Sequence, residues 1–333
     1  MQIVLAVTGR ASASAQELGE ALKAGWLSHQ SRDQLQIVPY SWGYSEVSAS
    51  YPIADIFPGR VDPEEAGKRL VALLEAGNPL YLPACHLGQS LQSEYLSPEA
   101  AALVNLEELP DFPSSFIRGV ARAYGQENPD PQIWENLGRA LAHTVVVTGS
   151  PKPLFSPSGV LATIAKTHPE IAQITKENWE TILIEAQKFG HQRYLELSKA
   201  NTSGKLQETQ IGTLPAGGCA WGIGELLGRL GARLDFAADF LDEHTRLPQV
   251  LENADLLVAN IPELSPWNLP GSPVAHLSGI ASKLGLPIVV VTSKNNLSRP
   301  EMAEQGIDGV YQFSFESYGM KEAGLRLART WSR

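Results

Sequence analysis

The stretch DLLVANIPELSPWNLPGSPVAHLSGIASKLGLPIVVVT, residues 255–292, decides the fold class. It opens and closes with the short apolar runs 255–259 and 287–292, which are typical of strands buried on both faces. Residues 273–284, between those runs, carry apolar positions at helical spacing. A strand, a helix and a strand in this order predict two parallel strands joined by a crossover helix, the repeating unit of a doubly wound α/β sheet.

The same alternation recurs at both ends of the chain. Apolar runs predict further strands, and helical patterns flank them, at residues 2–7, 15–27, 35–40, 309–313 and 320–331. The middle reads as an insertion, with a helix starting at Asp62 and Pro63, a strand at 143–148 and a long helix at 175–200. We therefore predict two lobes. Residues 1–60 plus 240–333 form a Rossmann-like doubly wound parallel-sheet domain, and residues 61–239 form an inserted second α/β domain.

Composition narrows the class of protein. A chain of 333 residues is long enough for two cores. The formal net charge of -10 repels polyanions, so nucleic acid is not expected as a partner. No apolar stretch is long enough to span a membrane, and the N-terminus lacks a signal-peptide pattern. The two cysteines, Cys85 and Cys219, form no metal-spaced pair, so a reduced, cytoplasmic setting is expected.

Two groups of residues are candidates for a site. Gly217, Gly218, Gly222 and Gly224 precede and enter a helical pattern, where free amides could bind a nucleotide or another anion. Close packing of helices explains the same glycines equally well. Glu263 and Ser265 follow a predicted strand at its carboxyl end, where open α/β sheets bind ligands.

Other candidate residues carry weaker signals. Asp255 opens the strand that Glu263 follows, and it is either a strand-edge residue or a functional acid. Trp42 follows a predicted strand, where packing in the core is the commoner use of an aromatic ring. The seven histidines form no recognised catalytic or metal spacing, and no P-loop is present.

Four parts of the chain resemble one family. They are VTGRAS at 7–12, PYSWGYSE at 39–46, the stretch 146–159 in the middle lobe, and the glycine-rich and apolar residues from 215 to 232 and from 254 to 310. In order and framework these parts resemble the glycerate kinases, which transfer the γ-phosphate of ATP to glycerate. The resemblance implies a two-lobed fold, ATP and Mg as cofactors if the chain is active, and a small hydroxy acid or nucleotide as ligand. It adds Arg10 and Ser12 to the predicted nucleotide- or anion-binding residues.

The chain departs from that family at acidic positions. Trp42 stands where the family has an aspartate, and the Gly-Glu-Gly-x-x-Asp motif is replaced by Asn-Ile-Pro-Glu-Leu-Ser at 260–265. Phosphoryl transfer depends on positioned charge, so these changes predict impaired or altered activity, with the chain a pseudoenzyme candidate. Two alternatives stay open. One is a true kinase that uses Glu46, Asp255 or Glu263, and the other is a non-catalytic binding or regulatory protein that keeps the two-lobed scaffold.

Overall fold

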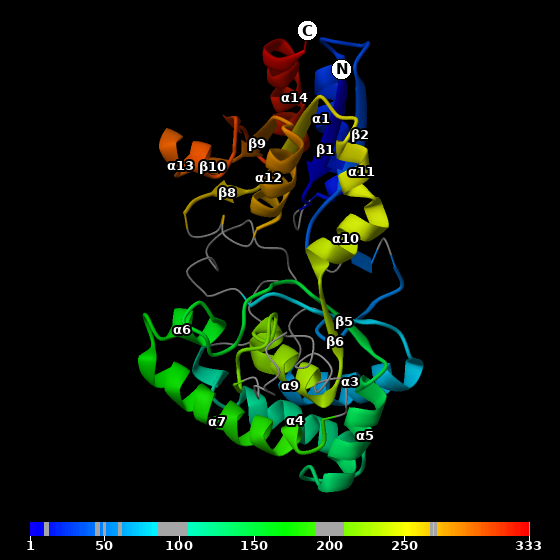
Figure 1. Ribbon diagram of the computed structural model, residues 1–333, viewed down its shortest axis with the longest axis vertical. Helices are drawn as coiled ribbons and strands as arrows, with labels where there is room; N and C mark the ends of the chain where they lie inside the picture. The colour runs from blue at the N-terminus through cyan, green and yellow to red at the C-terminus, as the bar shows by residue number, and fades with distance from the viewer. Residues whose placement is uncertain are drawn as a thin grey trace, which may run out of the picture. The chain divides into compact units, whose positions relative to one another are not determined.

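The computed structural model describes residues 1–9, 13–43, 47–48, 51–58, 62–85, 106–190, 210–266, 269 and 272–332 (Figure 1). These residues form two compact units. Unit 1 comprises the described residues of 1–50 and Ala238–Arg333, and unit 2 those from Tyr51 to Ala237. The sequence pattern predicts the divisions at residues 60 and 240. Among the described helices, none combines the length and the apolar character that crossing a bilayer requires.

Unit 1 is built on a parallel sheet of five strands in the order β11-β9-β7-β1-β2. The strands are β1 (Gln2–Val7), β2 (Gln34–Pro39), β7 (Leu256–Asn260), β9 (Ile288–Thr292) and β11 (Gly309–Gln312). Leu5 pairs with Ile37 on one side and with Val258 on the other. The chain leaves β1 toward β2 and later returns to build β7, β9 and β11 on the other side of β1. The predicted doubly wound α/β class is thereby confirmed, and its topological switch point lies between β1 and β7.

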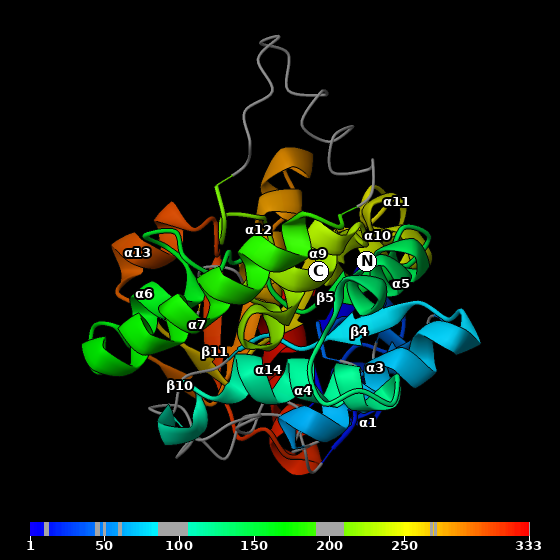
Figure 2. The same ribbon diagram turned by 90° about the horizontal axis from the view of Figure 1, so that it is seen from below.

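Helices cover both faces of this sheet. On one face α1 (Ala15–Leu27) and α14 (Ser317–Trp331) lie side by side, as Figures 1 and 2 show. Their apolar residues share a core with Ile3, Leu5 and Val258. Because a crossover between parallel strands is right-handed, α12 (Pro273–Leu284), between β7 and β9, covers the opposite face. Unit 1 also contains α10 (Ala237–Thr245), α11 (Leu247–Leu251), α13 (Arg299–Glu304) and the short pair β8 (Glu263–Leu264) and β10 (Lys294–Asn295).

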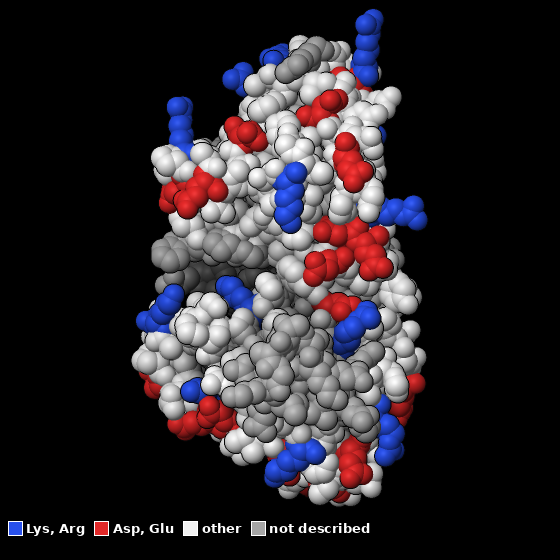
Figure 3. Space-filling model, in the orientation of Figure 1, with Lys and Arg blue, Asp and Glu red and all other residues white. Residues whose placement is uncertain are grey.

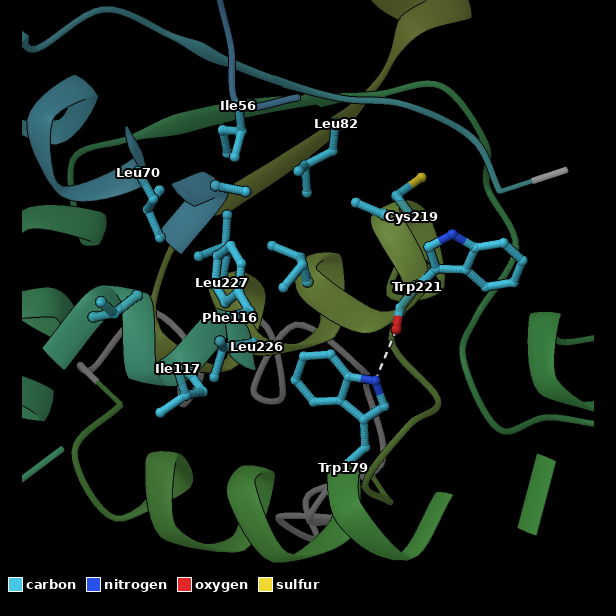
Figure 4. Packing of buried hydrophobic residues seen from close by; sticks show 14 of the residues in the cluster. Ile56, Leu70, Leu82, Phe116, Ile117, Trp179, Cys219, Trp221, Leu226 and Leu227 are labelled. Atoms are coloured by element: carbon cyan, nitrogen blue, oxygen red, sulfur yellow. Dashed lines mark hydrogen bonds between the residues drawn. The ribbon is translucent and has the colours of Figure 1, made fainter. Parts of the chain in front are cut away.

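Unit 2 has a parallel sheet of its own, in the order β3-β4-β5-β6. Its strands are β3 (Ala54–Asp55), β4 (Leu80–Leu82), β5 (Val145–Thr148) and β6 (Arg233–Phe236). Its helices are α3 (Pro63–Ala76), α4 (Phe112–Ala123), α5 (Pro131–Leu141), α6 (Val160–Ile164), α7 (Pro169–Gln187) and α9 (Ile223–Leu230), with the short helices η1 (Leu106–Glu108) and η2 (Cys219–Gly222). The core lies between these elements, where the buried indole N–H of Trp179 donates to the carbonyl of Trp221 at 2.7 Å (Figure 4).

A buried carboxylate links distant parts of unit 1. Asp33 accepts hydrogen bonds from the Met1 amine at 2.8 Å, the Trp26 indole at 2.9 Å and the Ser332 hydroxyl at 2.6 Å. Burial alone would raise the pKa of Asp33. The amine, the hydroxyl and the indole more than offset burial, because each stabilises the ionised form, and the pKa of Asp33 is lowered.

A lowered pKa makes the stability of unit 1 depend on pH through Asp33. The contribution is fully present above the unfolded-state pKa of about 3.9 and is lost as pH falls through the lower folded value. We expect Asp33→Asn to reduce the free energy of unfolding by about 2 kcal/mol at pH 7 and by progressively less below about pH 4. Urea unfolding at a series of pH values measures this difference. Glu304→Gln, at an exposed acid of the same unit, is the control. A difference that stays constant from pH 7 to pH 3 would contradict this account.

Candidate functional site

The carboxyl edge of the sheet in unit 1 brings the ends of three strands together. The side chain of Asn260, the last residue of β7, accepts from the amide of Thr8 at 2.6 Å and donates to the carbonyl of Thr8 at 2.9 Å. The hydroxyl of Thr8 in turn donates to the carbonyl of Tyr40, just beyond β2, at 2.9 Å. Asn260 is buried, and its side chain continues the hydrogen bonding between β7 and β1 beyond the ends of these two strands, at the switch point. In open α/β sheets this edge is where ligands bind.

Three polar side chains form a chain of hydrogen bonds at this edge. The hydroxyl of Tyr40 donates to Oδ1 of Asp242, on α10, at 2.7 Å. The other carboxylate oxygen, Oδ2, lies 2.8 Å from Nε2 of His276, in the first turn of α12. Burial raises the pKa of Tyr40 well above its usual range, and the neighbouring negative charge of Asp242 raises it further. Tyr40 therefore stays protonated and acts as a donor to Asp242.

Aromatic contacts hold the imidazole in place. The rings of Tyr40 and His276 are stacked, with centroids 6.4 Å apart and planes 18° apart. Trp42 meets the same imidazole edge-on, at 6.2 Å and 75°. Trp42 is buried, in agreement with its interpretation as a core residue, but the ring that it packs against belongs to a polar cluster.

The hydrogen bonds decide which nitrogen of His276 carries a proton. An ionised carboxylate can only accept, so Nε2 donates to Asp242, and Nδ1 of the neutral ring has the free lone pair. Among the described residues, Nδ1 has no hydrogen-bond partner, and the His276 side chain is 26% exposed. Asp239 and Glu243 also lie on α10, and Figure 3 shows acidic side chains gathered over that helix. The cluster can accept a hydrogen bond or a proton from a small molecule.

The predicted acids of unit 1 lie at two different ends of the sheet. Oε1 of Glu263 accepts from the Asn296 side chain at 2.7 Å and lies 3.5 Å from Nζ of Lys294, while Ser265 is buried beyond β8. Asp255 accepts from the amide of Gln2 at 2.7 Å, at the amino end of β7. Strand β7 has five residues, so roughly 13 Å separates its first and last Cα atoms. The structure therefore does not bring Asp255 together with Glu263 and Ser265.

The glycine cluster belongs to unit 2 and is tightly packed. The amide of Gly217 donates to the carbonyl of Leu214, and that of Gly218 to the carbonyl of Lys152, both at 2.9 Å. A Cβ at Gly224 would lie 2.5 Å from the carbonyl oxygen of Ala216, and Gly222 has a φ of 112°. These contacts favour the close-packing interpretation of the glycines.

Three residues singled out from the sequence lie outside the described part of the chain. Arg10 and Ser12 are the other two predicted anion-binding residues, and Glu46 is one of the acids of the kinase alternative. Their roles stay predictions.

The backbone of the glycine-rich segment carries strain. Ala216, Ala220 and Trp221 all have φ between 45° and 62°, a region that non-glycine residues rarely adopt. The strained turn lies against the ends of β4 and β5, where the amide of Trp221 donates to Sγ of Cys85 at 2.8 Å. The other thiol of the chain is buried here too, and burial raises the pKa of Cys219 to about 12. Neither thiol is placed to react as a thiolate.

Comparison with known proteins places the chain among its relatives. Residues 184–330 match the model of the glycerate kinase family. The C-terminal part of the chain is thus similar to the glycerate kinase family. Its fold resembles the crystal structure of "putative glycerate kinase 2" from Salmonella typhimurium LT2, with a TM-score of 0.57 and 14% identity over 99% of this chain and 98% of that one. At that identity the likeness is one of fold.

Two mycobacterial proteins match a shorter part of this chain. They are the uncharacterized proteins Mb2228c of Mycobacterium bovis (strain ATCC BAA-935 / AF2122/97) and MT2261 of Mycobacterium tuberculosis (strain CDC 1551 / Oshkosh). Each is 29% identical over 93 residues, which is 28% of this chain. The match spans 24% of the length of each relative.

Sequence reasoning missed the cluster of Tyr40, Asp242 and His276. The three residues come from segments that are far apart along the chain, and no local spacing connects them. Two weak signals existed. Tyr40 is the last residue of the strand predicted at 35–40, and His276 lies in the first turn of the helix predicted at 273–284. Asp242 had no signal of its own, because acidic residues on an amphipathic helix usually face solvent.

Proposed function

We propose that the chain is a glycerate kinase-family protein whose transfer of phosphate from ATP to glycerate is impaired or altered. The observation that supports this most directly is the chemistry at the carboxyl edge of unit 1. There the side chain of Asn260 is occupied by Thr8, and the buried ring of Trp42 lies where the resemblance expects an aspartate. An apolar ring can neither orient a substrate hydroxyl nor hold a metal ion.

The residues that the resemblance implies for ATP and its metal do not fit these groups in the described part of the chain. The amides of Gly217 and Gly218 donate to carbonyls within unit 2, so these two glycines do not fit a phosphate. The described part of the chain contains no group of three or more His, Cys, Asp or Glu side chains arranged to hold a metal ion. In the proposal the magnesium complex of ATP is a substrate, and no step is assigned to these glycines or to a metal.

The test is an ATP-dependent phosphorylation assay. Purified protein is incubated with ATP, Mg and D-glycerate, and phosphoglycerate is followed by ³¹P NMR beside an active glycerate kinase as the reference. Because removing one group that stabilises transition-state charge costs about 10²- to 10³-fold, we expect kcat/KM to be at least ~10³-fold below the reference. Product formation at the reference rate would contradict the proposed impairment.

A second candidate function is a binding protein without catalysis. It is favoured by the same internal bonding of the Gly217 and Gly218 amides, which leaves these groups unavailable to a transferring phosphate. Thermal-shift titrations with D-glycerate, with and without ATP and Mg, separate the two candidates, because a ligand that binds the native state raises the melting temperature. A shift with D-glycerate but no phosphorylated product would favour this second function.

A further inference from the structure

We propose that Nδ1 of His276 accepts the proton of a ligand hydroxyl at the carboxyl edge of the sheet in unit 1, with Asp242 and Tyr40 as the residues that position the ring. The inference rests on the proposed function in one respect, since the ligand is taken to be the hydroxy acid of the family reaction. The binding of a ligand hydroxyl at Nδ1 depends on the geometry of unit 1.

Both oxygens of Asp242 are engaged by separate donors. Tyr40 bonds to one oxygen at 2.7 Å and His276 to the other at 2.8 Å. Tyr40 is fully buried, so no ligand can reach its hydroxyl. The backbone carbonyl of Tyr40 is in turn held by Thr8 at the end of β1. A carboxylate fixed in this way sets both the orientation of the imidazole and its tautomer.

The most exposed side chain of the cluster is that of His276, at 26%, beside 17% for Asp242. The ring of Tyr40 is stacked relative to the imidazole at 6.4 Å, Trp42 meets the ring edge-on, and Nε2 is engaged by Asp242. With about a quarter of the side chain exposed, Nδ1 is the remaining polar atom of the ring. A histidine held only for packing would not need a fully buried tyrosine to fix its carboxylate partner.

The lone pair on Nδ1 selects the chemical class of the ligand. An acceptor nitrogen bonds to an O–H group, whereas a carboxylate oxygen has no hydrogen to offer. The negative charge of Asp242, 2.8 Å from Nε2, also disfavours a ligand carboxylate beside the ring. A hydroxy acid would therefore direct its hydroxyl at His276 and its carboxylate elsewhere.

The cluster also offers a proton acceptor, His276, at the sheet edge where the resemblance expects an aspartate. Trp42 occupies the aspartate position of the family motif, and its ring contacts His276. In the reaction the O–H bond of the hydroxy acid breaks and its proton moves to Nδ1. The oxygen keeps the electron pair and attacks the terminal phosphorus of a nucleoside triphosphate. The bridging P–O bond breaks, and its electrons leave on the diphosphate. Asp242 stabilises the imidazolium of His276 until the imidazolium releases its proton to water.

The experiment follows the ring nitrogens by NMR in protein labelled with ¹⁵N-histidine. Without ligand, we expect the His276 signals to show a proton on Nε2 and a lone pair on Nδ1, with His276→Gln identifying them. D-Glycerate should shift the Nδ1 signal in a saturable way. Propionate, which has the carboxylate but no hydroxyl, should not. The inference is overturned if the proton lies on Nδ1 instead of Nε2. It is also overturned if D-glycerate at millimolar concentration leaves the Nδ1 signal unchanged.

Variants distinguish a positioning role from a structural one. Asp242→Asn keeps its oxygen toward the Tyr40 hydroxyl and presents its amide N–H to Nε2 of His276. The ring proton should therefore move from Nε2 to Nδ1, and the shift caused by D-glycerate should be abolished. Circular dichroism checks that the fold is kept. His244→Gln is the matched control. His244 lies in the same unit, but its Nδ1 bonds to the carbonyl of Phe240 at 2.8 Å, so this change should leave the His276 response intact. An Asp242→Asn protein with the wild-type tautomer would contradict the role of Asp242.

Activity gives an independent readout. Where turnover is measurable, His276→Gln should lower kcat on the order of 100-fold with little change in KM, because a general base acts on the chemical step. Turnover that survives His276→Gln would overturn the inference and leave the proposed function intact. If D-glycerate shifts the Nδ1 signal but no phosphorylated product forms, the hydroxyl site is supported and phosphoryl transfer is contradicted.

Discussion

Replacing Arg229 by methionine is expected to lower the free energy of unfolding of unit 2 by about 3–5 kcal/mol. The guanidinium is fully buried and donates from Nε to Oε1 of Glu225 at 2.7 Å, from Nη1 to Gln187 at 3.0 Å and from Nη2 to the carbonyl of Gln210 at 2.7 Å. Without it the buried carboxylate of Glu225 has no opposite charge beside it. Burial already raises the pKa of Glu225, and Arg229 is the main group that opposes this rise.

The chain has two compact units, and a single global free energy of unfolding is not well defined for such a protein, so the measurement has to be local. Hydrogen exchange followed by mass spectrometry on peptides of α9 and α7 reports the opening free energy of unit 2 directly. Arg233→Met is the control, because Arg233 is 55% exposed, and we expect it to change stability by less than about 0.5 kcal/mol.

Adding Glu225→Gln to Arg229→Met tests the physical reason. In the native turn the amide of Gly212 donates to Oε1 of Glu225 at 2.8 Å, and the amide of Leu214 donates to Oε2 at 3.1 Å. A glutamine has no charge and keeps one oxygen that can accept from one of these two amides. The double variant should therefore recover part of the loss, since it removes the unpaired charge and keeps an acceptor. A double variant that is less stable than Arg229→Met alone would contradict the charge explanation.

The fold of unit 1 could be predicted because its strands are buried on both faces. Burial on both faces produces continuous apolar runs such as 2–7 and 287–292, and few other structures require them in alternation with helices. The start of α3 was equally readable, since Asp62 does accept from the amide of Glu64 at 2.8 Å. The ends of the helices and strands were predicted less accurately than their type. The helix predicted at 175–200 is α7, which begins earlier, at Pro169, because a proline in the first turn does not interrupt a helix. It ends at Gln187, and residues 191–200 of the prediction lie outside the described part of the chain.

The candidate site was less predictable for two physical reasons. The cluster of Tyr40, Asp242 and His276 depends on contacts between residues up to 236 positions apart, and sequence spacing cannot encode such contacts. The glycines at 217 and 218 posed a different problem. Whether a glycine amide is free for an anion depends on which carbonyl lies opposite it, and the partner of Gly218 is Lys152, in a distant loop. Only the folded chain settles that choice.

The second large effect is expected at the contact between α1 and α14 in unit 1. A Cβ at Gly324 would lie 2.0 Å from the carbonyl oxygen of Leu22 and 2.9 Å from the amide nitrogen of Trp26, and both are backbone atoms that cannot rotate away. Gly324→Ala therefore has to push the two helices apart. We expect it to lower the free energy of unfolding by about 3 kcal/mol, at the upper end of the usual cost of overpacking.

Gly279→Ala is the matched control for this change. Gly279 also lies within a helix of unit 1, it is exposed, and a Cβ there would meet nothing within 4 Å. Since alanine favours the helix over glycine, Gly279→Ala should stabilise unit 1 by up to about 1 kcal/mol. Urea unfolding of both variants beside the wild type gives two differences of opposite sign. If Gly324→Ala were also neutral or stabilising, the close approach of α1 and α14 would not be a property of the folded chain in solution.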